Sequence, residues 1–500
     1  MTATSVPQAR SVPLPEAVTP FVVAIDIGSG STRCCLYDAH ARPIKSRTHT
    51  AEHRFTERAD GTAEIDADQV AREVAAVLTA AVAGIEPGAI AGVAMDTFAS
   101  SLVCVDADGD ALTPCFSYAD ARSAGALARL RDRLDEAEVH QRTGTRLHTS
   151  YHPARLLWLR ETHPELLART AALVSLGEYV YARLAGITGA ATSTMAWAGL
   201  LNRHTGALDE ELLSVTGVRA GQFAPIIDPD RPITAVSPQV ARRWPALAGA
   251  AWFPAIPDGL ASNFGVGAHD PATAALSAAT SGAIRVVVAG TPAVLPPGLW
   301  AYSVSRSQSI VGGALNDVGR AMLWLQDTVA PLTAAQINAA LVSPARPNVP
   351  LVLPFLTGER ATGWAGNARA VITGVSSSTT PSDLWRGTAE GVAVSYARVF
   401  AELRRVDPAL RTVIASGGVT GHYPGLMRVV AHALGFPVRV VDVKRVTMRG
   451  AAVLALSVLA PDRPAAVIPT GDPIVGDPAE APYYAELLAR FSALYDAVIG

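Results

Sequence analysis

The first long apolar run of the chain lies in the segment FVVAIDIGSGSTRCCLYD, residues 21–38. The run stops at Asp26, Gly28 and Gly30 follow among small hydroxyl residues, and a second apolar run begins at once. A continuous apolar run is typical of a strand that is covered on both faces. The segment therefore predicts a buried strand, a glycine-rich turn and a second strand that pairs back on the first.

The turn after Asp26 lacks the features of two common phosphate-binding motifs. The chain contains no GxxxxGK[ST] loop, and GSGSTR runs into a strand rather than into the helix that a dinucleotide fingerprint requires. A turn of this composition can still surround a phosphate with its N–H groups and with the hydroxyls of Ser29, Ser31 and Thr32. Asp26 is then placed to hold magnesium, directly or through water. An ordinary hairpin turn is the alternative.

Whole-chain properties limit the classes of protein to consider. The 500 residues exceed what one core usually supports, so two domains are expected. A net charge of −3 gives no electrostatic footprint for nucleic acid. The four cysteines form no CxxC pair and indicate buried free thiols in a reducing cytoplasm. Neither a signal peptide nor a membrane span is expected.

Strand-like and helix-like runs alternate along the chain, which predicts an α/β fold. Residues 273–290, TAALSAATSGAIRVVVAG, repeat the opening theme of strand, small-residue turn and strand. This repetition predicts two domains built on one plan. The other expected elements are strands at 90–95, 250–258 and 413–415, a hairpin at 101–114, and helices at 67–82, 154–161, 177–184, 426–434, 449–459 and 480–499.

Two further carboxylates close strand-like runs. Asp96 follows the run at 90–95, and Asp258 stands at a strand-to-helix junction in the sequence AAWFPAIPD. A carboxylate at such a junction can accept the proton of a hydroxyl nucleophile, but aspartate is also a common helix N-cap. Position alone leaves both readings of Asp258 open.

Five short motifs occur in the order found in FGGY-family carbohydrate kinases. These motifs are DIGSGSTR, PDGLASNFGVG, ATSGA, TGER and ASGG, and STMAWAGLLNRHTGALD, IVGGALNDVG and LPFLTGERATGW resemble the gluconokinase-like branch. The resemblance covers roughly residues 20–460. It implies two actin-like, ribonuclease H-like α/β domains with an ATP and sugar cleft between them. The expected bounds are a flexible tail at 1–20, a sugar-binding domain at 21–255, a nucleotide-binding domain at 256–460 and a packed helical extension at 461–500.

The resemblance also implies roles for particular residues. Asp26 resembles the metal-associated aspartate of the family, and Asp258 the catalytic base. The implied phosphate- and nucleotide-binding residues are Gly28, Ser29, Gly30, Ser31, Thr32, Thr280, Ser281, Gly282, Gly312, Gly313, Asn316, Gly417 and Gly418. The implied substrate-binding residues are Thr97, Ala99, Ser100, Asp120, Arg122 and Asp258.

The expected activity is ATP- and Mg²⁺-dependent phosphorylation of a sugar, sugar acid or polyol, with a gluconate-like acceptor first. A xylulose, other ketose or polyol kinase of the same fold is an alternative, and so is a catalytically inactive actin-like sugar- or nucleotide-binding protein. Ala99 and Ser100 replace the bulky residue and histidine usual in gluconokinase-like chains, which puts the substrate in doubt. The expected partner is a small carbohydrate rather than nucleic acid or a membrane, with a homodimer as an open possibility.

Overall fold

The computed structural model describes residues 8–499, which form two compact units. Unit 1 contains the chain up to Gly267 together with Ala301–Ser309 and Lys444–Ile468. Unit 2 contains Ala268–Trp300, Ile310–Val443 and the chain from Pro469 onward. Three segments that the sequence analysis assigns to the second domain, residues 256–267, 301–309 and 444–460, lie in unit 1.

A mixed sheet forms the centre of unit 1, in the order β12-β6-β1-β2-β3, with β13 also beside β6. The strand β1 pairs antiparallel with β2 and parallel with β6, so the predicted strand–turn–strand is confirmed. The bounds are β1 (Phe21–Ile27), β2 (Ser31–Tyr37), β3 (Pro43–Glu52), β6 (Ile90–Thr97), β12 (Ala251–Trp252) and β13 (Ile256–Pro257).

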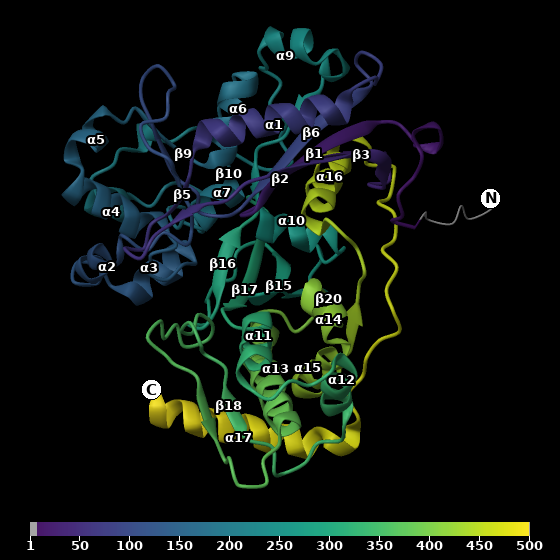
Figure 1. The fold of residues 1–500 in the computed structure, drawn as a ribbon. Helices are drawn as coiled ribbons and strands as arrows, with labels where there is room; N and C mark the ends of the chain where they lie inside the picture. The colour runs from purple at the N-terminus through teal and green to yellow at the C-terminus, as the bar shows by residue number, and fades with distance from the viewer. Residues whose placement is uncertain (1–7, 500) are drawn as a thin grey trace. The chain divides into compact units, whose positions relative to one another are not determined.

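Helices cover both faces of this sheet (Figure 1). The helix α1 (Ala67–Val82) packs on β2 and β3, and α16 (Val446–Leu459) packs on β1 and β6. On the α1 side, Val23 and Ile25 share a core with Leu78. On the other side, a Cβ at Gly92 would lie 2.5 Å from Cδ1 of Leu459. Burial on both faces explains why β1 is apolar without alternation.

Two predicted strand regions of unit 1 differ from expectation. The hairpin expected at 101–114 is present as two isolated antiparallel bridges, Val105 with Ala111 and Leu102 with Phe116. In addition, β7 (Val103–Val105) pairs with β9 (Ala172–Val174), which the sequence did not predict. The expected strand at 250–258 is split into β12 and β13. Pro254 has no N–H to donate to a sheet ladder, so it interrupts this strand.

The peripheral part of unit 1 is mainly helical, and it includes the helices predicted at 154–161 and 177–184. Its helices are α2 (Ala124–Arg131), α3 (Glu136–Thr143), α4 (His152–Thr162), α5 (Pro164–Arg169), α6 (Leu176–Ala185), α7 (Thr192–Trp197), α8 (Glu210–Thr216) and α9 (Pro238–Arg243). The short helix α10 (Asp258–Gly265) follows β13 directly and packs against α16.

A second sheet has the order β16-β17-β15-β14-β20-β21, and its strands β15, β14, β20 and β21 and most of β17 belong to unit 2. Its hairpin partners β14 and β15 are antiparallel, and β14 pairs parallel with β20, as β1 does with β6. The bounds are β14 (Thr273–Ala278), β15 (Gly282–Ala289), β16 (Trp300–Ser303), β17 (Gln308–Leu315), β20 (Thr412–Ser416) and β21 (Val438–Val440). The shared hairpin-plus-parallel-strand arrangement confirms that both units follow one plan.

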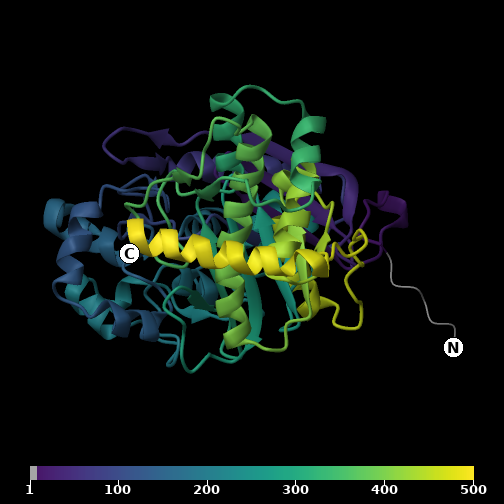
Figure 2. The same ribbon diagram turned by 90° about the horizontal axis from the view of Figure 1, so that it is seen from below.

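The helices of unit 2 include a long one, α13 (Pro381–Val406), which contacts α15 (Pro424–Leu434) and α17 (Ala481–Val498). Figure 2 shows α17 in yellow, lying across the helices of unit 2. Tyrosine hydroxyls fix this last helix. Tyr484 accepts a hydrogen bond from Arg386 at 2.9 Å, and Tyr495 donates to Glu359.

Residues 8–20 pack on unit 1 instead of forming a loose tail. Val12 is buried and bridges to Ile44, and Gln8 bridges to Val467. The apolar side chain of Val12 explains this ordering, because its burial offsets the entropy lost on fixing the backbone. Residues 1–7 lie outside the described residues.

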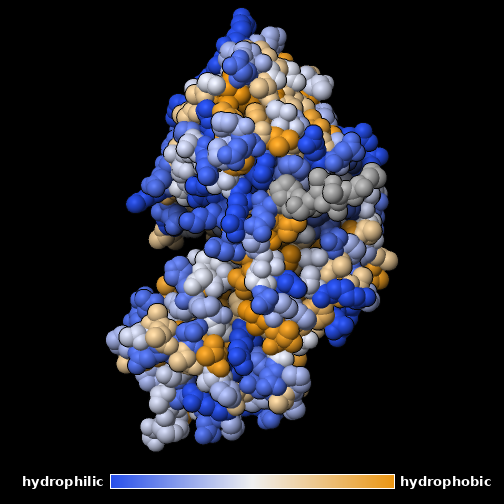
Figure 3. Space-filling view, turned by 90° about the vertical axis from the view of Figure 1, so that its right-hand side faces the viewer, coloured by the Kyte–Doolittle hydropathy of each residue, from blue (hydrophilic) through white to orange (hydrophobic). Residues whose placement is uncertain are grey.

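The surface is mainly polar, and the cysteines lie inside the protein. Figure 3 shows hydrophilic residues over much of one face, with apolar residues scattered among them. Cys34, Cys35, Cys104 and Cys115 are buried and form no disulfide, as predicted. Within residues 8–499, none of the helices is both long enough and apolar enough to span a membrane.

A glycine substitution tests the contact between α10 and α16. A Cβ at Gly450 would lie 1.7 Å from the Ala261 carbonyl oxygen, whereas a Cβ at Gly421 meets nothing within 4 Å. We expect Gly450→Ala to lower the free energy of unfolding by about 1–3 kcal/mol or more, the usual cost of overpacking. Gly421→Ala, also within a helix, should be neutral or stabilising by up to about 1 kcal/mol. Equal urea midpoints for the two variants would contradict the close helix contact.

Candidate active site

Three aspartates lie at the carboxyl edge of the unit 1 sheet. Asp26 on β1 stands directly opposite Asp96 on β6 in the parallel register. On the other side of β6, Ile256 of β13 pairs with Asp96, and Asp258 follows β13 at the start of α10. Because neighbouring parallel strands end at the same edge, their register brings the three carboxylates together.

The three carboxylates differ in burial. Asp96 is fully buried, and neither of its carboxylate oxygens has a hydrogen-bond partner among the described residues. Burial raises the pKa of Asp96 well above its ordinary range, and the charges of Asp26 and Asp258 raise it further. Asp258 is only half-buried. It is therefore the most accessible of the three.

Asp26 is also buried, but it has two polar neighbours. Arg33 Nη1 lies 3.4 Å from Asp26 Oδ2, and the Thr447 hydroxyl donates to the same oxygen at 3.1 Å. Burial raises the pKa of Asp26, and the Arg33 charge opposes that effect. The sequence analysis missed both neighbours. The hairpin register, which places Arg33 opposite Asp26, could have revealed the first, but no sequence signal pointed to Thr447.

The structure also describes the helix start at Asp258. Pro257 is the N-cap residue, so Asp258 occupies the first helical position. Its carboxylate Oδ1 accepts the N–H of Gly259 at 2.6 Å. This contact is one residue away, whereas an N-cap side chain bonds the second or third residue of the helix. The N-cap alternative for Asp258 is therefore wrong.

The glycine-rich turn between β1 and β2 presents some of the expected groups and turns others inward. Ser29 and Gly30 are exposed, and Ser31 is buried with no hydrogen-bond partner for its hydroxyl in the described chain. Thr32 is fully buried, and its hydroxyl donates to Glu73 of α1 at 3.0 Å. The buried Thr32 hydroxyl therefore links the turn to α1.

The segment at residues 97–100, which is expected to line the sugar-binding site, makes hydrogen bonds to other parts of unit 1. Ser100 has a positive φ of 55°, and its hydroxyl donates to the Trp197 carbonyl at 2.6 Å. The buried Arg155 donates to the Ser100 carbonyl at 2.9 Å. The Thr97 hydroxyl donates to the Phe98 carbonyl at 3.3 Å. Of this segment, Ala99 is half-buried.

The pair Asp120 and Arg122 is also committed to structural contacts. Arg122 Nη2 lies 2.6 Å from Asp120 and 2.7 Å from Glu64, and the Asp120 carboxylate accepts the Ala63 N–H at 3.1 Å. The guanidinium of Arg122 also lies 5.1 Å from the ring centroid of Phe116. Two carboxylates neutralise the charge of Arg122.

A second polar edge lies in unit 2, where small residues replace carboxylates. The turn residues Thr280 and Ser281 are exposed after β14, and Gly417 and Gly418 are exposed after the neighbouring parallel strand β20. Gly417 has φ 113°, and a Cβ there would lie 2.2 Å from the Ala278 carbonyl oxygen. The close approach of the two turns therefore requires glycine at this position.

Three other expected nucleotide contacts have packing roles. Gly312 and Gly313 lie inside β17, where added Cβ atoms would meet Ile284 O at 2.6 Å and Ala361 Cβ at 2.7 Å. The Asn316 side chain donates to the Gly358 carbonyl at 3.0 Å. Gly282 is similarly enclosed, since a Cβ there would lie 2.0 Å from the Tyr396 hydroxyl.

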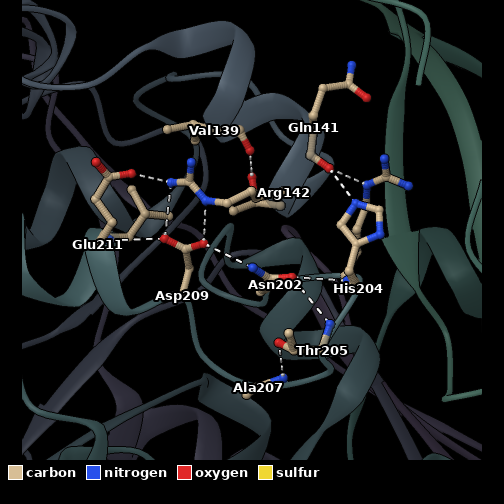
Figure 4. A network of polar contacts seen from close by, with 12 residues as sticks. Val139, Gln141, Arg142, Asn202, His204, Thr205, Ala207, Asp209 and Glu211 are labelled. Atoms are coloured by element: carbon tan, nitrogen blue, oxygen red, sulfur yellow. Dashed lines mark hydrogen bonds and ion pairs between the residues drawn. The ribbon is translucent and has the colours of Figure 1, made fainter. Parts of the chain in front are cut away.

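The largest polar network drawn in Figure 4 joins α3 to α8. Arg142 Nε lies 2.9 Å from Asp209, which is also the N-cap of α8, and Arg142 contacts Glu211 as well. Asn202 donates to Asp209 at 3.4 Å. All these charges are paired within the network, which indicates a structural clamp rather than a reactive site.

Comparisons with known proteins agree with this architecture. The model of the FGGY family of carbohydrate kinases matches with its N-terminal domain at residues 21–265 and its C-terminal domain at residues 274–459. The chain therefore belongs to this family and is a carbohydrate kinase.

Individual relatives are distant but cover nearly the whole chain. The gluconokinase of Bacillus subtilis (strain 168) is 24% identical over 421 residues, which are 80% of each protein. The solved gluconate kinase from Lactobacillus acidophilus has a TM-score of 0.89 and 22% identity over 96% of this chain and 98% of that one. The solved xylulose kinase from the same organism has the same TM-score and identity, over 95% and 98%. The shared fold thus accommodates kinases with different acceptors.

The buried carboxyl of Asp96 predicts a pH-dependent cost to stability. Because its pKa is raised in the folded state, the folded protein loses stability as pH rises above the ordinary aspartate range. We expect Asp96→Asn to be more stable than the wild type at neutral pH by about 1–3 kcal/mol, the cost of an unpaired buried polar group. Thermal unfolding in metal-free buffer should show this difference shrinking toward about pH 4. The surface variant Asp132→Asn should show no such trend, and a pH-independent Asp96→Asn effect would refute the assignment.

Proposed function

We propose that this kinase transfers the γ-phosphate of ATP to a hydroxyl of a sugar, sugar acid or polyol, with Asp258 as the general base. The observation that carries the proposal is the difference in exposure among the three clustered aspartates. Asp96 is fully buried, Asp26 is buried against Arg33 and Thr447, and Asp258 is half-buried at the start of α10. A base must reach the hydroxyl that it deprotonates.

The same carboxylates fit a magnesium ion. Mg²⁺ is usually held by one or two carboxylates together with waters and substrate phosphates, so it needs no full protein cage. No group of three or more His, Cys, Asp or Glu side chains with metal-site geometry occurs within residues 8–499. The two unpartnered oxygens of Asp96 and the adjacent Asp26 match the smaller requirement. The bound ion would offset the charge of the transferred phosphoryl group.

The donor phosphates require neutral hydrogen-bond donors as well. Ser29, Gly30 and Ser31 are the members of the first turn that we assign to the phosphates, whereas Thr32 supports the turn from below. In unit 2 we assign the exposed turn at 280–281 and the glycines 417–418 to the nucleotide. Backbone N–H groups in such turns bind anions without a lysine.

A gluconate-like acceptor remains the first choice, because the gluconokinase of Bacillus subtilis is among the relatives. One feature favours a neutral acceptor such as a ketose or polyol. The charge of Arg122 is already neutralised by Asp120 and Glu64, so this residue provides no unpaired cation for a sugar carboxylate. Four buried, reduced cysteines support a cytoplasmic location.

Replacing the proposed base tests the mechanism. Asp258→Asn preserves size and leaves the first turn of α10 able to form, so we expect melting and nucleotide binding close to those of the wild type. Turnover should fall by about 10²–10⁴-fold, the usual contribution of a general base. Wild-type turnover in a correctly folded variant would remove Asp258 from this role.

A substrate panel tests the proposed activity. ADP release should be followed with gluconate, xylulose, other ketoses, sugar acids and polyols. We expect at least one acceptor to give a kcat/KM of about 10⁴ M⁻¹s⁻¹ or higher, within the usual enzyme range. Excess chelator should abolish the rate, because the phosphoryl charge then loses its main counter-ion. Activity that survives the chelator would contradict the metal proposal, and a neutral acceptor that outperforms gluconate would support the reading of Arg122.

A further inference from the structure

A buried histidine lies directly beneath the glycine-rich turn of unit 1. His53 Nε2 lies 2.9 Å from the carbonyl oxygen of Gly28, and the His53 backbone N–H donates to the carbonyl of Gly30 at 3.2 Å. The other ring nitrogen, Nδ1, lies 2.8 Å from Glu73 Oε2 on α1. The side chain of His53 is fully buried, and that of Glu73 is 14% exposed. One residue thus holds both glycines of the turn to α1.

The contacts of Glu73 define its protonation. Thr32 donates to Oε2 at 3.0 Å and Gln69 donates to Oε1 at 2.9 Å, and His53 Nδ1 lies 2.8 Å from Oε2. An ionised carboxylate accepts several hydrogen bonds and donates none, so this arrangement is that of an anion.

The contacts of His53 then define its own state. Nε2 faces a backbone carbonyl and Nδ1 faces an ionised carboxylate, and both of these groups only accept. A neutral imidazole carries one N–H, so it can satisfy only one of them. The geometry is complete only when both ring nitrogens carry a proton.

We infer that His53 is a positioning residue, held as an imidazolium by Glu73, that fixes the phosphate turn in its binding conformation. When the ring carries only one proton, one of the two ring hydrogen bonds is lost, and Thr32 alone then links the turn to Glu73 of α1. Binding of the donor phosphates then weakens. The assignment of the turn to phosphate rests on the proposed kinase function, whereas the hydrogen-bond arrangement does not.

Other charged groups near His53 are more exposed than Glu73. Glu52, Arg54 and Glu57 line the open cavity beside the ring together with Ser29 and Gly30. All three charged residues are exposed, so water screens their effect on the ring. Phe55 stacks on the imidazole with ring centroids 6.1 Å apart. On β1, Asp26 is bonded to Arg33 and Thr447, not to His53. Glu73 is therefore the charge that decides the state of the ring.

The chain offers a matched variant that removes the need for the charge. In Glu73→Gln the amide N–H₂ can donate to Nδ1 of a neutral imidazole and to Thr32, while its oxygen still accepts from Gln69. The Nε2–H bond to Gly28 is then preserved with a neutral ring. A doubly protonated ring would instead place its Nδ1–H against an amide donor, so this variant should function best at high pH, opposite to the wild type.

The experiment measures binding of Mg²⁺ and adenylyl imidodiphosphate, a non-hydrolysable ATP analogue, by calorimetry between about pH 6 and about pH 9. The ratio of the affinity of the wild type to that of Glu73→Gln should fall about 10-fold over this range, the equivalent of one charged hydrogen bond. Titrations common to both proteins cancel in this ratio. A constant ratio would overturn the inference.

Two further measurements separate this inference from the proposed function. ¹⁵N NMR of the His53 ring in the nucleotide-free protein should show two protonated nitrogens at about pH 6 in the wild type. A single protonated nitrogen would overturn the inference whatever the enzyme binds. His53→Gln should lower kcat/KM for ATP about 10-fold or more, whereas His49→Gln on the same strand β3 should leave it within about 2-fold. If no nucleotide binds but the ring is doubly protonated, the proposed function fails and the hydrogen-bond assignment survives.

Discussion

Electrostatic repulsion among Asp26, Asp96 and Asp258 is the constraint around which the edge of unit 1 is built. The parallel register of β1, β6 and β13 forces the three carboxylates together, and burial removes the water that would screen them. Arg33 and Thr447 contact Asp26 directly, whereas Asp96 accepts no hydrogen bond in the described chain and is affected by the Arg33 charge only from a distance. A site with this excess of negative charge is suited to a cation and to a hydroxyl proton, and unsuited to a bare phosphate.

The two units present opposite chemistry on one topology. Each has a hairpin followed by a parallel strand, and each places its polar groups where those strands end. In unit 1 the strand ends carry aspartates, and in unit 2 they carry Thr280, Ser281 and Gly417. Uncharged N–H groups can donate hydrogen bonds to the negatively charged phosphates of a nucleotide, which carboxylates would repel. These side chains are the reason why we propose that unit 1 holds the metal and the base and that unit 2 contributes the exposed turns to nucleotide binding.

Local patterns in the sequence were enough to predict much of this fold. The helix at 67–82 and the strand–turn–strand units were predicted correctly because their burial repeats along the chain itself. Asp26 and Asp258 were predictable because each follows an apolar run. The chain also returns antiparallel across the turn at 106–110, as predicted, but the pairing of β7 with β9 was not predicted because β9 is distant in sequence. Local pattern does not report such long-range pairing.

The residues that support the site could not be predicted from the sequence, because their contacts are also made between residues distant along the chain. Thr447 and Glu73 reach the first strand and its turn from helices far along the chain, and His53 acts through contacts that only the folded turn creates. Glycine motifs carried a related ambiguity. A Cβ would meet neighbouring atoms at Gly417, which is exposed in a turn, and also at Gly312 and Gly313, which are buried in a strand. Spacing in the sequence does not distinguish an exposed turn glycine from a glycine enclosed in the core.

The covering of β1 by α16 has a consequence for how the protein is made. Thr447 is separated from its partner Asp26 by 421 residues, and the helix that carries it closes one face of the first sheet. At about 5–20 residues per second, a ribosome needs roughly 20–80 s to synthesise that interval. Throughout this time the apolar face of β1 and β6 has no cover from its own helix. The nascent chain therefore exposes an apolar sheet surface for most of its synthesis. We expect chaperones that bind apolar segments during translation to bind unit 1.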